Sequence, residues 1–192
     1  MRKNKYLLIS ISIFIMLFIS CAFSCEKKEP AAQPVPDEIM RKILADFSQP
    51  DGDAINSDCV EYISEQKGKE LTDGIINVMY SKDDKPVDMS KIEKYAIRQS
   101  KEIPAVEIGI FKLYDKVTAD YVKDMANNRI AKMRGENKNN GVCLETANNA
   151  EARSYGNYVY YVSHPQKDKI FRIIENMLRD KDDKIQRINI YA

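Results

Sequence analysis

Apolar residues recur along most of the chain at the two spacings that helices and strands produce. Spacings of three and four predict helices over about residues 37–49, 71–79, 115–135 and 163–181. Alternation with a period of two predicts strands over residues 92–98, 105–113, 151–155 and 157–163, and a last short strand at 185–190. Gly156 lies between two of these strands and predicts a hairpin turn.

The order of these elements indicates the fold class. From residue 105 onward the order is strand, helix, strand, strand, helix and a last short strand. Such an order suits helices packed against a mainly antiparallel sheet. We therefore expect a two-layer α+β domain with the helices on one face of the sheet.

The amino terminus has a different pattern. Three basic residues, Arg2, Lys3 and Lys5, precede an uncharged apolar run over residues 6–25. A basic start followed by an apolar run is typical of an export signal or a membrane anchor. Both interpretations place everything after Cys25 outside the cytoplasm.

Three forms of this segment remain open. In the first, Leu17–Cys21 resembles a bacterial lipobox, in which small Ser20 precedes a cysteine that is acylated and becomes the mature N-terminus. In the second, Ala22 and Ser24 precede Cys25 as small residues suited to ordinary cleavage or to a poorer lipobox. In the third, the run stays uncut and spans the membrane, for which its length suffices. We favour acylation of Cys21.

Composition limits the domain organisation. Residues 26–36, EKKEPAAQPVP, contain charges and three prolines and predict an extended spacer. We expect a signal peptide over residues 1–20, a tether and linker over 21–36, and a single domain over 37–192. With 44% hydrophobic and 31% charged residues, a chain of this length can form a core.

Charge limits the partners. The formal net charge is +1, without the basic excess that draws proteins to nucleic acid. Loss of residues 1–20 removes three of the 30 basic side chains and leaves the 29 acidic ones, so the mature charge is about −2. Attachment to the membrane would then depend on a lipid rather than on charge.

Two longer runs carry a family resemblance. They are KIEKYAIRQSKEIPAVEIGIFKLYD and YGNYVYYVSHPQKDKIFRIIENML, which follow the export segment and the spacer. Together these features resemble the bacterial lipoproteins of domain-of-unknown-function family 4358, over roughly residues 37–180. The resemblance implies a membrane-anchored surface protein of Gram-positive-type bacteria, and it implies no known activity.

Few residues suit catalysis, and we expect no cofactor. His164 is the sole imidazole, and its place between Ser163 and Pro165 favours helix capping over proton transfer. Glu107 is the most interesting carboxylate, because it lies among apolar strand residues and needs water or a partner such as Lys112 or Lys94.

The cysteines and the acidic turn residues are candidates for a disulfide and for a metal site. Cys59 and Cys143 are the domain's cysteines, and they form either a disulfide or two separate thiols. Asp51, Asp53 and Asp58 share a loop but lack the spacing of a calcium-binding EF-hand, so we expect no metal site.

Tyrosines provide the candidate ligand surface. Alternation along the predicted hairpin places some of these rings on the sheet face away from the helices, and an open face would expose an aromatic patch. The four residues are Tyr155, Tyr158, Tyr160 and Tyr161.

The expected function follows from the tether and from the scarcity of catalytic groups. We expect a lipid-anchored extracytoplasmic module that binds an envelope protein or polymer without catalysis. The alternative is an envelope enzyme acting on peptidoglycan or another polymer, with Glu107 and His164 as its candidate groups.

Overall fold

The computed structural model describes residues 33–47, 55, 58–83 and 85–190, with residues 180–190 described as backbone alone. The predicted signal peptide, Cys21, Cys25 and most of the linker lie outside these residues, as do Asp51 and Asp53. Within the described part, no helix is both long and apolar enough to cross a membrane.

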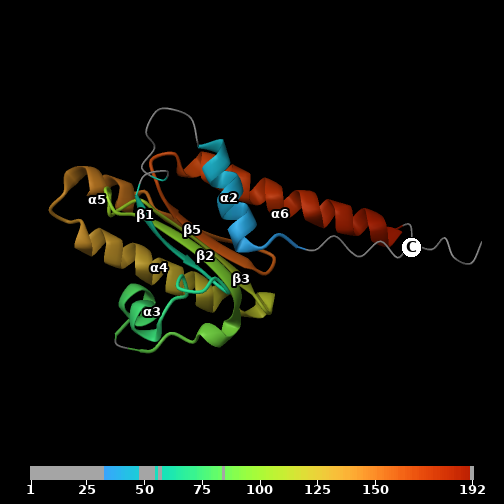
Figure 1. Cartoon of the computed structure of the whole chain (residues 1–192), viewed down its shortest axis with the longest axis horizontal. Helices are drawn as coiled ribbons and strands as arrows, with labels where there is room; N and C mark the ends of the chain where they lie inside the picture. The colour runs from blue at the N-terminus through green and yellow to red at the C-terminus, as the bar shows by residue number, and fades with distance from the viewer. Residues whose placement is uncertain (1–32, 48–54, 56–57, 84, 191–192) are drawn as a thin grey trace, which may run out of the picture.

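A five-stranded antiparallel sheet forms the centre of the domain (Figure 1). The strand order is β1-β2-β3-β5-β4, so β3 lies in the middle. The strands are β1 (Cys59–Ile63), β2 (Ile92–Ser100), β3 (Glu107–Leu113), β4 (Glu151–Tyr155) and β5 (Tyr158–Ser163).

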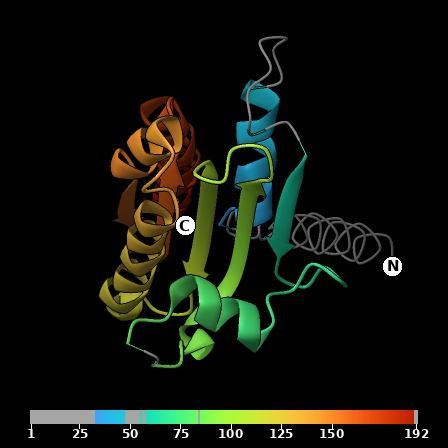
Figure 2. The same ribbon diagram turned by 90° about the vertical axis from the view of Figure 1, so that its left-hand side faces the viewer.

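Helices cover both faces of this sheet (Figures 1 and 2). One face packs against α3 (Asp73–Tyr80), α4 (Ala119–Glu136) and α5 (Gly141–Asn148). The other face packs against α2 (Pro36–Asp46) and α6 (Lys167–Ile190). Two short 3-10 helices, η1 (Met89–Lys91) and η2 (Lys116–Thr118), precede β2 and α4.

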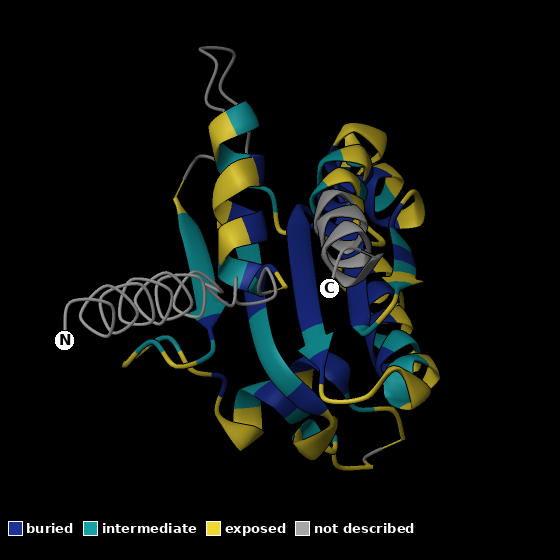
Figure 3. Cartoon of the chain, turned by 90° about the vertical axis from the view of Figure 1, so that its right-hand side faces the viewer, coloured by how far each residue is buried: buried dark blue, intermediate teal, exposed yellow. Residues whose placement is uncertain are grey.

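The predicted α+β class is confirmed, with an antiparallel sheet and helices packed against it. The expected restriction of the helices to one face is wrong. In β3, Ile110 packs toward α2 and α6, whereas Phe111 packs toward α3 and α4, and both are fully buried. Figure 3 shows the central strand of the sheet coloured almost entirely as buried. Two cores therefore lie on opposite sides of one sheet.

Most predicted elements are present. The hairpin is confirmed, since Tyr155 pairs with Tyr158 across a turn in which Gly156 has a φ of 58°. The last predicted strand is wrong, because residues 185–190 continue α6 as helix. Strand β1 and the short helix α5 were not predicted from the sequence.

The end of the predicted linker belongs to the folded domain. Pro34 and Pro36 are buried, and Pro36 begins α2. The Tyr158 hydroxyl donates a hydrogen bond of 2.7 Å to the Pro34 carbonyl oxygen. The chain thus enters the domain beside the β4–β5 turn.

Candidate functional site

A buried polar network lies between the sheet and α4. Glu107, on β3, is completely buried, and its carboxylate faces the Arg129 side chain of α4, which is 4% exposed. Arg129 donates from Nε to Oε1 at 3.0 Å and from Nη2 to Oε2 at 2.7 Å. This two-point contact is the strong geometry for a guanidinium and a carboxylate.

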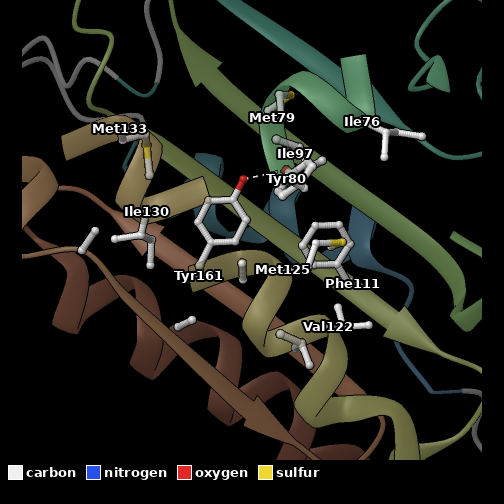
Figure 4. Packing of buried hydrophobic residues seen from close by; sticks show 14 of the residues in the cluster. Ile76, Met79, Tyr80, Ile97, Phe111, Val122, Met125, Ile130, Met133 and Tyr161 are labelled. Atoms are coloured by element: carbon white, nitrogen blue, oxygen red, sulfur yellow. Dashed lines mark hydrogen bonds between the residues drawn. The ribbon is translucent and has the colours of Figure 1, made fainter. Parts of the chain in front are cut away.

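Two tyrosines extend the network into the core (Figure 4). The Tyr161 hydroxyl donates to Glu107 Oε1 and lies 2.8 Å from the Tyr80 hydroxyl. A phenol has one hydrogen to donate, so Tyr80 is the donor to Tyr161. The chain of hydrogen bonds therefore runs from α3 through β5 to β3.

Burial sets the protonation of these groups. Burial, and then the charge of Glu107, raise the pKa of both Tyr80 and Tyr161 well above the ordinary phenol value. Burial works against the charged form of Arg129, but the adjacent Glu107 carboxylate raises the pKa of its guanidinium. The phenols therefore stay neutral and the arginine stays charged at physiological pH.

The network reaches solvent at Glu136, the last residue of α4. Arg129 Nη1 lies 3.3 and 3.2 Å from the two Glu136 carboxylate oxygens. The Glu136 side chain is 54% exposed, so this ion pair is hydrated, unlike the pair with Glu107.

An open groove of about 360 Å³ lies at this end of the network. Its lining combines the Arg129–Glu136 pair with residues of α3, β1 and β2: Tyr62, Gly74, Ile75, Val78, Met79 and Gln99. Val78 is 73% exposed and adds an apolar side chain to the open side of the lining. The groove thus offers apolar contacts beside a buried cation.

The predicted tyrosine patch is not present. Tyr158, Tyr160 and Tyr161 are at most 3% exposed, and the half-buried Tyr155 packs against the α2–α6 core. The prediction assumed an open sheet face, and here helices cover both faces. These rings serve the two cores rather than a ligand surface.

The two candidate catalytic groups lie on opposite faces of the sheet. Glu107 points to α4, whereas the His164 ring packs edge-on against Phe47 beside α2, with ring centroids 5.5 Å apart. His164 Nδ1 accepts a hydrogen bond from the Gln166 amide at 3.0 Å, as expected for a capping role. The structure does not bring these groups to one site.

The proposed lysine partners of Glu107 are also wrong. Lys112 binds Glu93 at 2.8 Å, and Lys94 binds Glu65 at 3.0 Å. Arg129 was missed, although the sequence contained a signal. It lies among the apolar positions that α4 buries, and a cation there needs a buried partner.

The cysteines and Asp58 form no functional site among the described residues. Cys59 and Cys143 do not form a disulfide; Cys143 is buried, and Cys59 Sγ donates to the Ile55 carbonyl oxygen at 3.6 Å. Asp58 pairs with Lys101 at 2.9 Å. Among the residues that the structure describes, no three side chains of the metal-binding types gather into a site.

Comparisons with known proteins found no match. No family model, no curated protein and no solved structure matches the chain. The resemblance to domain-of-unknown-function family 4358 therefore stays a prediction.

Proposed function

We propose that this chain is a lipid-anchored extracytoplasmic protein whose domain binds a partner in the cell envelope without catalysis. The groove beside Arg129 and Glu136 is the observation that carries the binding role, because it combines exposed apolar surface with a buried charge. A ligand site of this kind needs a few placed polar groups within an apolar lining.

The anchoring half of the proposal comes from the sequence. The basic start, the apolar run and the lipobox-like Leu17–Cys21 together favour export and acylation of Cys21. A tether of this kind confines the domain to a thin layer next to the membrane. Confinement raises the effective concentration of partners in the same layer.

The alternative of an envelope enzyme has less support. Glu107 is held by Arg129 and Tyr161 within the core, and His164 lies beyond the sheet. General acid–base catalysis needs its groups within hydrogen-bonding reach of one substrate. Neither residue lines the groove.

Palmitate labelling in a Gram-positive bacterial host tests the anchor. We expect the wild type to be labelled, Cys21→Ala to lose the label and Cys25→Ala to keep it. Protease added to intact wall-free cells should then remove the domain. An unlabelled wild type, or a domain that resists the added protease until the cells are lysed, would contradict the proposal.

A further inference from the structure

We propose that the groove beside Arg129 binds the C-terminal carboxylate of a peptide whose last side chain is aliphatic. This inference rests on the proposed binding function and names the ligand class for the same groove. Four features support it: a guanidinium edge that Glu136 contacts at only one nitrogen, a replaceable carboxylate, an apolar wall and unused polar groups.

The first feature is the geometry of Arg129. Its Nε and Nη2 face Glu107, so the remaining fork is the outer edge formed by Nη1 and Nη2. Glu136 accepts from Nη1 but not from Nη2. A planar carboxylate can bridge both nitrogens of such an edge, which makes it a better match than the present contact.

The second feature is the weakness of the ion pair between Glu136 and Arg129. Its side chain is 54% exposed, and it ends α4, where the helix dipole disfavours a negative charge. When Glu136 turns into water, it is hydrated and leaves the outer edge of Arg129 open. A ligand carboxylate then replaces its charge instead of adding to it. A dianion such as phosphate fits less well, because Glu107 and Glu136 both lie next to the same guanidinium.

The third feature is the apolar wall next to this fork. Ile75, Val78 and Met79, all on α3, line the groove. Val78 is 73% exposed and gains most from being covered, since burial of apolar area stabilises a complex. An aliphatic side chain next to the carboxylate fits this wall.

The fourth feature is polar and points to a peptide. Gln99 and Tyr62 line the groove, and neither side chain makes a hydrogen bond to another described residue. The Gln99 amide can both donate to and accept from a peptide bond. The groove is open, so a chain can continue from it into solvent, and its volume of about 360 Å³ suits the last residues of that chain.

Isothermal titration calorimetry of the full chain in detergent tests the proposal. The probe is N-acetyl-alanyl-alanyl-leucine, and its C-terminal amide is the matched control ligand. We expect the acid to bind at least about tenfold more tightly than the amide, because the amide cannot form the charged two-point contact. Equal affinities, or no binding of the acid, would overturn the proposal.

Two pairs of variants locate the binding. Val78→Asp should weaken binding of the acid at least about tenfold through repulsion and lost apolar contact, whereas Val142→Asp, at an equally exposed valine of α5, should not. Glu136→Gln should strengthen binding by roughly two- to fivefold because it removes a competing charge, whereas Glu145→Gln, at an exposed position of α5, should not. An unchanged affinity in both groove variants would place the ligand elsewhere.

Further experiments distinguish a peptide ligand from a free acid, and distinguish failure of this inference from failure of the proposed function. If 4-methylpentanoate binds as tightly as the tripeptide, the ligand is a free acid and the peptide assignment is wrong. An acylated protein without carboxylate binding would overturn this inference and leave the anchor intact. A protein that binds the carboxylate but is never exported would overturn the proposed anchor and leave this inference intact.

Discussion

Gly109 and Tyr161 lie directly opposite each other on β3 and β5, and the Tyr161 ring occupies the space where a side chain at residue 109 would lie. A Cβ atom at Gly109 would be 2.1 Å from Tyr161 Cε1. The missing side chain lets the ring cross the neighbouring strand, where its hydroxyl meets Glu107. The polar network thus depends on a glycine.

Replacement of this glycine should be costly. Gly109→Ala forces the ring or the strand to move, and we expect a loss of about 2–4 kcal/mol in the free energy of unfolding, measured with urea. The matched control is Gly135→Ala in α4, where a Cβ meets nothing within 4 Å. That variant should be neutral or more stable by up to about 1 kcal/mol. A Gly109→Ala protein within experimental error of the wild type would show that the ring does not need this space.

The buried ion pair should show strong coupling in a double-mutant cycle. Arg129→Met leaves the Glu107 carboxylate buried without a counter-ion, and Glu107→Gln leaves the buried Arg129 with only its contact to the half-exposed Glu136; we expect each to cost about 3–5 kcal/mol. The combination Glu107→Gln with Arg129→Met should cost clearly less than the sum of the two.

Glu136→Gln is the control for this cycle. The Glu136 side chain is 54% exposed and hydrated, so the variant should cost less than about 1 kcal/mol. Additive effects of the two buried substitutions would contradict a direct interaction between Glu107 and Arg129.

The tyrosines should limit stability at alkaline pH. The pKa of Tyr80 is raised in the folded state, mainly by burial, so above about pH 10 the unfolded chain loses a proton that the folded chain keeps. Stability is therefore unaffected by this group below pH 10 and falls as the pH rises further.

Tyr80→Phe isolates this effect. The fall in stability above pH 10 should be shallower in the variant, by up to about 1.4 kcal/mol per pH unit. Unfolding by urea between pH 8 and 11.5 measures the slope. Parallel curves for the two proteins would show that Tyr80 does not remain protonated in the fold.

The attachment of the chain at Pro34 should depend on Tyr158. Tyr158→Phe leaves the buried Pro34 carbonyl oxygen without this donor, at a cost of about 1–2 kcal/mol. Hydrogen exchange should become faster at the Val35 amide, which bonds to Glu38 in the adjacent turn. Tyr121→Phe, which removes the acceptor of the Asp88 amide, should leave Val35 unchanged. Equal exchange rates at Val35 in all three proteins would contradict a stabilising role for the Tyr158–Pro34 hydrogen bond.

Local spacing predicted the elements well where one periodicity dominates. Alternation of rings and valines fixed the β4–β5 hairpin, and apolar spacing fixed α4. The stretch containing β1 carries no clear period, because its residues are half-buried at the edge of the sheet. The isoleucines at 185, 188 and 190 are too few to define a period, and the backbone there continues α6.

The layers and the site needed three-dimensional information. An apolar stripe shows that a helix packs on a sheet, but it does not show on which face, so α2 and α6 were not assigned to the far side. Glu107 was recognised as a carboxylate in need of a partner, but Arg129 is 22 residues away and only tertiary packing brings them together. The groove combines residues from four separate elements.

Acylation of Cys21 can be measured by mass spectrometry of the amino-terminal peptide, recovered from the membrane fraction of cells that express the full chain. We predict a peptide that begins at Cys21 and carries a diacylglyceryl group. A soluble cytosolic protein whose first peptide still contains residues 1–20 would contradict it.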